Sequence, residues 1–89
     1  MNIIPAIDIK DGKVVKAKQG DRDRYNPISK DSGFSSDPFK FIKEMTSVYR
    51  PSIFYIADIN SLISQNHNID LIQDIASVNT NIHFWVDIG

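Results

Sequence analysis

The sequence contains no cysteine among its 89 residues. This excludes disulfide bonds, zinc sites built on thiolates and catalysis by a thiol nucleophile. No apolar run in it approaches the roughly 20 residues that a membrane-spanning helix needs. The N-terminus also lacks the basic flank and unbroken apolar stretch of a secretory signal. We therefore expect a cytoplasmic protein with no membrane partner.

No charge of one sign dominates, because 10 Lys and Arg stand against 11 Asp and Glu. Such a balance creates no overall field that would attract nucleic acid, so no nucleic-acid partner is expected. Leucine and glutamate are scarce, with two and one residues, whereas there are 15 Ile and 10 Asp. Isoleucine favours strands. Aspartate favours caps, turns and strand ends, where functional sites are commonly built.

Apolar runs and apolar periodicity predict five main elements. The strands cover residues 2–9, 53–59 and 82–88, and the helices cover residues 37–49 and 68–78. Asp37 followed by Pro38 is typical of a helix start, and Asn68 can cap the second helix. The strands are apolar on both faces, as in a sheet covered by helices. Their alternation with helices predicts an α/β domain with parallel strands and right-handed crossovers.

The connection after the first strand carries further signals. Asp11 followed by Gly12 predicts a tight turn into a second extended segment at residues 14–18. Residues 20–36 hold many polar, Gly and Pro residues without a helical period, which predicts a long loop. Long loops of compact domains are commonly lids or binding segments. We expect the aromatic residues Phe84 and Trp85 of the third strand to lie in the core.

Three aspartates stand at the predicted carboxyl ends of the three strands, in the similar segments AIDI, IADI and VDIG. They are Asp8, Asp58 and Asp87. Ligands of parallel α/β proteins bind beyond these strand ends. Any one aspartate could equally cap the loop that follows it, but three together favour a site. Asp8 lies between Ile7 and Ile9, and a poorly hydrated carboxylate of this kind suits a general base.

Basic residues surround Gly20 in the predicted loop region. They include Lys16, Arg22 and Arg24. Arginine binds phosphate in a bidentate manner, so an anionic substrate such as a sugar phosphate would fit this segment. The simpler alternative is a solvated loop in which the arginines pair with the intervening aspartates.

The opening segment resembles a known family. Residues 3–16 (IIPAIDIKDGKVVK) with residues 19–21 (QGD) are similar to the phosphoribosylformimino-5-aminoimidazole carboxamide ribotide isomerases of histidine biosynthesis, a (β/α)8-barrel family. The likeness continues through residues 36–38, residues 55–59 and Asn68, and covers essentially the whole chain. It implies an Amadori rearrangement of a phosphorylated ribotide, in which an aminoaldose becomes an aminoketose without a metal or organic cofactor.

The resemblance also implies roles for individual residues. Asp8 takes the position of the base that moves a proton between two carbons. Together with the charge pattern and the strand-end aspartates described above, the resemblance leads us to expect a substrate-binding set of Lys16, Gly20, Arg22, Arg24, Asp58 and Gly89. Lys16 stands where the family usually has an arginine, and this change weakens a bidentate phosphate contact. The general acid of the family comes from a later strand that this sequence does not contain.

Two features depart from the family pattern. Residues 87–89 (DIG) replace a run of glycines whose backbone amides hold a substrate phosphate, so a carboxylate stands where an anion should approach. The segment 22–28 looks more like paralogues with a different substrate. A barrel also needs about 250 residues. We therefore expect residues 1–89 to form a partial barrel domain, the N-terminal segment of a longer protein and inactive alone.

Three alternatives to the isomerase remain open. The parent could be a barrel paralogue that acts on another phosphorylated ligand. Asp8, Asp58 and Asp87 could instead form an oxygen site for Mg²⁺ in a metal-assisted enzyme, although no metal is our primary expectation. The chain could also be a non-catalytic fragment that pairs its strand edges with a second copy or with the missing barrel portion.

Overall fold

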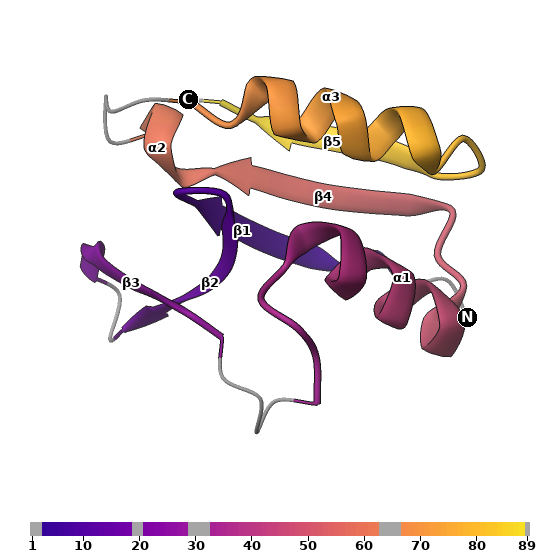
Figure 1. The fold of residues 1–89 in the computed structure, drawn as a ribbon, viewed down its shortest axis with the longest axis horizontal. Coiled ribbons are helices and arrows are strands. Elements are labelled where there is room, and N and C mark those ends of the chain that lie inside the picture. Colours follow the sequence, from indigo (N-terminus) through magenta and orange to yellow (C-terminus); the bar gives the residue numbers. More distant parts are fainter. Residues whose placement is uncertain (1–2, 19–20, 29–32, 63–66, 89) are drawn as a thin grey trace.

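The computed structural model describes residues 3–18, 21–28, 33–62 and 67–88, with the backbone alone for residues 17–18 and 21–27. Three strands come first along these residues, and helices then connect two further strands (Figure 1). They are β1 (Ala6–Lys10), β2 (Lys13–Lys18), β3 (Asp21–Pro27), α1 (Pro38–Tyr49), β4 (Ile53–Asp58), α2 (Ile59–Leu62), α3 (Ile69–Val78) and β5 (His83–Asp87). The helices predicted at 37–49 and 68–78 coincide with α1 and α3 to within one residue.

The strands form one sheet in the order β3-β2-β1-β4-β5. β1, β4 and β5 run parallel to one another, and α1 and α3 connect them. β2 and β3 extend the sheet beyond β1 through antiparallel pairing. The predicted α/β class with parallel strands is therefore confirmed, and so is the predicted hairpin at Asp11 and Gly12. Both turn residues have positive φ, 53° and 77°, as a two-residue hairpin of type I′ requires.

Both long helices pack on the same face of the sheet (Figure 1). The core between them contains apolar residues of β1, β2, β4 and the two helices. Its buried members are Ile7, Ile9, Val14, Phe41, Ile42, Phe54, Ile56, Ile72 and Ile75. The strand members alternate along the chain because successive side chains of a strand point to opposite faces. This spacing determines which residues are left for the other face.

The opposite face of β1, β4 and β5 is only partly covered. Val15, Ala57 and Ile59 form a small buried cluster on it, but Trp85 is 55% exposed. The expectation that Trp85 lies in the core is therefore wrong. Trp85 alternates with Phe84, which packs against the helix-side core, so the two aromatic residues point to opposite faces.

The predicted long loop at residues 20–36 is only partly a loop. Residues 21–27 form β3, which pairs antiparallel with β2 and has a register shift between Ala17 and Lys18. This strand is not predicted from the sequence, because its alternating Asp and Arg residues show no apolar face. Backbone hydrogen bonds to β2 form a strand without such a pattern.

The start of α1 follows the predicted capping pattern. The Asp37 carboxylate accepts a hydrogen bond of 3.1 Å from the backbone N–H of Phe39, and Pro38 occupies the first turn. Asn68 differs from the prediction, because its side chain makes no capping hydrogen bond to α3. Among the residues described, no helix has the length and apolar character needed to cross a membrane.

Candidate functional site

Asp8 and Asp87 lie in one row across the parallel strands. Asp87 is the last residue of β5, but β1 continues to Lys10, so Asp8 lies in the middle of its strand and not at the end that the sequence predicts. In the sheet register Asp8 is opposite Ala57 of β4, and Ala57 is opposite Asp87 of β5. Register partners point to the same face, so both carboxylates project from the face that the helices leave uncovered. Asp8 is half-buried, and its lateral neighbours Val15 and Ala57 are both buried. Its sequence neighbours Ile7 and Ile9, on which the expectation of poor hydration was based, instead point to the helix-side core.

Asp58 does not belong to this row, which corrects the expectation that the three aspartates are equivalent. It lies opposite Ile9 in the register, one residue further along than the sequence echo suggests. A displacement of one residue turns a strand side chain to the other face. Asp58 is accordingly 0% exposed. In the described part of the chain, no three acidic or histidine side chains gather as a metal site would require.

The carboxyl group of Asp58 is fully engaged inside the protein. It accepts hydrogen bonds from the backbone N–H and hydroxyl of Ser61 at 3.3 and 3.1 Å. It also accepts bonds from the backbone N–H and the side-chain amide of Asn68, both at 2.7 Å. These four contacts favour the alternative of a residue that caps the following loop over one that binds substrate.

Tyr55 lies on the same face as this row, two residues before Ala57 on β4, and sequence reasoning missed it. Its hydroxyl donates a hydrogen bond of 2.9 Å to Oδ2 of Asp87. This bond raises the pKa of Tyr55, and desolvation and the negative charges of Asp87 and Asp8 act in the same direction. Tyr55 could have been identified from the sequence by its position two residues before Ala57, because residues two apart on a strand point to the same face.

The basic residues predicted to bind substrate do not gather around Asp8. Lys16 is exposed and alternates with Val15 on β2, so it points away from the face of Asp8. Arg22 and Arg24 lie on β3, two strands or about 10 Å from β1, and their side chains are outside the described part. Gly20 and Gly89 also lie outside the described residues.

Lys10, which was not among the predicted substrate-binding residues, lies nearer to Asp8 than these basic residues do. Lys10 follows Asp8 by two residues on β1 and therefore points to the same face. It lies opposite Lys13 of β2, and its ammonium group is 3.4 Å from the carboxylate of Asp11. Strand alternation from Asp8 would have identified it.

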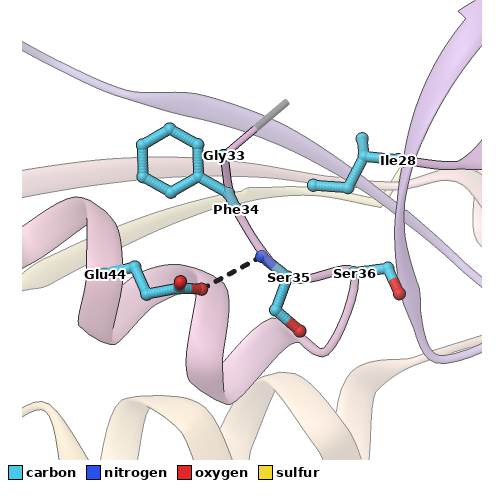
Figure 2. A pocket seen from close by; sticks show the side chains of 6 residues that line it. All are labelled: Ile28, Gly33, Phe34, Ser35, Ser36 and Glu44. Atoms are coloured by element: carbon cyan, nitrogen blue, oxygen red, sulfur yellow. Dashed lines mark hydrogen bonds between the residues drawn. The ribbon is translucent and has the colours of Figure 1, made fainter. Parts of the chain in front are cut away.

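A cavity of about 350 Å³ lies elsewhere, between the segment before α1 and the helix itself. Figure 2 shows its lining, in which Glu44 accepts a hydrogen bond of 3.0 Å from the backbone N–H of Ser35. Its apolar wall is formed by Ile28 and Phe34, which pack against the helix-side core. The cavity is therefore on the other face of the sheet from Asp8 and is separate from the carboxylate row.

These features define an α/β protein whose parallel strands carry carboxylates at their carboxyl ends, beside a basic hairpin. The sequence model of one family, described as histidine biosynthesis protein, matches residues 2–89. The chain belongs to this family.

Several curated proteins are similar to the chain. An uncharacterized protein of Methanocaldococcus jannaschii is 38% identical over 89 residues, which are 100% of this chain and 37% of that protein. Two relatives are 1-(5-phosphoribosyl)-5-((5-phosphoribosylamino)methylideneamino) imidazole-4-carboxamide isomerases. They come from Nitrosopumilus maritimus and Oceanobacillus iheyensis and are 36% and 33% identical over 76 residues, which are 85% of this chain and 29% of each relative. The chain thus spans between 29% and 37% of the length of these proteins. No solved structure matches it.

Proposed function

We propose that the chain is the N-terminal part of an aminoaldose–ketose isomerase of histidine biosynthesis that acts on a phosphorylated ribotide. The observation that carries this proposal is the position of Asp8 on the uncovered face of a parallel sheet, where it lies opposite Ala57 near the carboxyl end of β4. The names of the isomerase relatives support the choice of reaction.

The proposed architecture is the first part of a (β/α)8 barrel. β1, β4 and β5 are adjacent, parallel and connected by helices on one face, as successive strands of such a barrel are. The face with Asp8, Tyr55 and Trp85 would then point into the barrel. The relatives are much longer than this chain, and a protein of their length has enough residues for the remaining strands of a barrel.

Asp8 would act as the base of an Amadori rearrangement. In the ring-opened substrate, protonation of the C1 imine nitrogen acidifies the hydrogen on C2. The Asp8 carboxylate takes this proton. The electrons of the C–H bond form the C1–C2 double bond while the π electrons of the C1–N double bond move to the nitrogen, which gives an enaminol. The enol O–H then loses its proton, and C1 gains one, which gives the C2 ketone of the aminoketose. Val15 and Ala57 beside Asp8 limit hydration of the carboxylate, which favours proton transfer from carbon.

The phosphate contacts are proposed on the hairpin. Its candidates from the sequence are Lys16, Arg22 and Arg24, with a backbone contact at Gly20. Gly89, which follows β5 in the chain, is proposed as a second backbone contact. Lys10 is a further candidate because it shares the face of Asp8.

The test is the isomerase assay on the natural gene product that contains these residues, with the ribotide as substrate. We expect Asp8→Asn to lower kcat by at least about a hundredfold, the usual contribution of a positioned base. Asp70→Asn is a suitable control because Asp70 is exposed on α3. Turnover that is unchanged in Asp8→Asn would end the proposal.

A paralogue with another ligand is the second candidate, and Asp87 is the observation in its favour. The Asp87 carboxylate is held by Tyr55 in the same row as Asp8, and its charge opposes a phosphate at the end of β5. Under this alternative the natural gene product binds the ribotide of the isomerase reaction only weakly, and Asp87→Gly strengthens binding of that ribotide. Equal affinity in both forms would count against it.

A non-catalytic fragment is the third candidate. Trp85, Val86 and Ile88 are exposed on and beside the edge strand β5, and an open parallel edge is a surface for pairing with another chain. Size-exclusion chromatography with mass detection tests this candidate. A folded monomer of 10.1 kDa would contradict it.

A further inference from the structure

The buried polar side chains of the described residues form one cluster, which begins at the last residue of β4 and continues after that strand. They are Asp58, Asn60 and Asn68, with exposed fractions of 0%, 3% and 8%. The side-chain amide of Asn68 donates to Oδ1 of Asp58 and to Oδ1 of Asn60, each at 2.7 Å. Buried polar groups of this kind specify one arrangement only when every partner is in place.

This cluster reaches across the sheet end to the turn between β1 and β2. Oδ1 of Asn60 accepts a hydrogen bond of 2.8 Å from the backbone N–H of Asp11, and Oδ1 of Asn68 accepts one of 3.0 Å from the backbone N–H of Gly12. The side-chain amide of Asn60 also donates to Oδ1 of Asp11 at 2.8 Å. The partners are 49 and 56 residues apart in the chain.

The turn needs such support at Asp11. Its φ of 53° is in the left-handed region, which is unfavourable for residues with a Cβ atom, although Asp and Asn adopt it more readily than others. Both backbone N–H groups of the turn are bound by side chains from beyond β4, so the turn has a fixed position relative to that strand.

We propose that Asn68 is a positioning residue that locks the β1–β2 turn to the carboxyl end of β4 through Asp58 and Asn60. The lock fixes the hairpin that continues into β2 and β3. It is a property of the fold and is independent of the substrate. That the hairpin then presents Lys16, Arg22 and Arg24 to a phosphate is the one consequence that rests on the proposed function.

Hydrogen exchange followed by NMR tests the lock on the 89-residue chain without an activity assay. In Asn68→Ala we expect the amides of Asp11 and Gly12 to exchange about tenfold faster or more, because their acceptors are lost or loosened. The amides of β5 should change much less. Asn79→Ala is the matched control, because Asn79 makes one local side-chain bond to the carbonyl of Ile75. Exchange at Gly12 that is unchanged, or faster by the same factor everywhere in a folded chain, would overturn the proposal.

The titration of Asp11 gives a second readout that a general loss of stability would not imitate. The hydrogen bond from Asn60, followed by the bond from Lys10, lowers the pKa of Asp11. We expect Asn68→Ala to raise this pKa toward its usual value, since Asn60 loses a partner, and Asn79→Ala to leave it unchanged. An unaltered pKa in Asn68→Ala would contradict the lock.

If Asn68→Ala does not fold, a pH titration of the unsubstituted chain still tests the proposal. The side-chain amide signals of Asn60 and Asn68 should then shift with pH at the midpoint of the Asp11 carboxyl. The absence of any such shift at Asn68 would overturn the proposal.

Discussion

Asp8 lies directly opposite Ala57 in the parallel pair of β1 and β4, and not opposite Asp58. This one-residue offset separates two aspartates that look equivalent in the sequence. Asp8 points to the uncovered face together with Asp87, whereas Asp58 points into the protein and holds the loop after β4. The two residues should therefore respond differently to substitution.

Asp58→Ala is expected to lower the free energy of unfolding by about 3 kcal/mol, because it leaves buried N–H donors of Ser61 and Asn68 without an acceptor. Asp8→Ala should lower it by less than this, because Asp8 is only half-buried whereas Asp58 is 0% exposed. Urea denaturation of the two variants gives the comparison. Equal losses would show that the two aspartates share one environment after all.

Tyr55 is expected to titrate above its usual value of 10.0, which ultraviolet difference absorbance or ring-carbon NMR would follow. Because the pKa is raised in the folded state, the associated stability is fully present below about pH 10 and is lost as the pH rises through the folded value. Asp87→Asn should lower the midpoint, since the bond to Asp87 is the main cause of the shift. Asp74→Asn, on exposed α3, serves as the control, and equal midpoints in Asp87→Asn and the unaltered chain would contradict the Tyr55–Asp87 contact.

The same Ile→Val substitution should have a different effect on stability in the helix-side core than at an exposed position. Ile56 is fully buried on β4, and Ile88 is half exposed after β5. Ile56→Val is expected to lower the free energy of unfolding by about 1 kcal/mol, and Ile88→Val to change it by less than about 0.5 kcal/mol. Thermal unfolding followed by circular dichroism measures both. A larger loss in Ile88→Val would mean that residue 88 is covered in solution, as self-association through β5 requires.

The cap of α1 offers a further prediction. Asp37→Ala removes the acceptor for the backbone N–H of Phe39 and should lower the free energy of unfolding by about 1 kcal/mol. Asp74→Ala, which replaces an exposed aspartate of α3, should have little effect. Urea denaturation of both variants measures the difference, and a similar loss in the two would contradict a specific capping role.

Much of the fold follows from the sequence alone. The apolar spacing around Phe41, Ile42 and Met45 is helical, and Asp37 with Pro38 marks where that helix begins, because caps depend on neighbouring residues only. The Asp11–Gly12 turn is equally local, since only a few residue types adopt its positive φ values. These elements are determined by interactions within a few positions of the chain.

The tertiary structure alone decided the register of β1 against β4, the existence of β3 and the partners of Asn68. Each depends on backbone and side-chain hydrogen bonds between residues that are remote in the chain. The sheet register also determined that Asp8, Tyr55 and Asp87 share a face while Asp58 does not. The sequence by itself placed aspartates at the strand ends. Pairing between strands decided which way they point, because a shift of one residue exchanges the two faces of a strand.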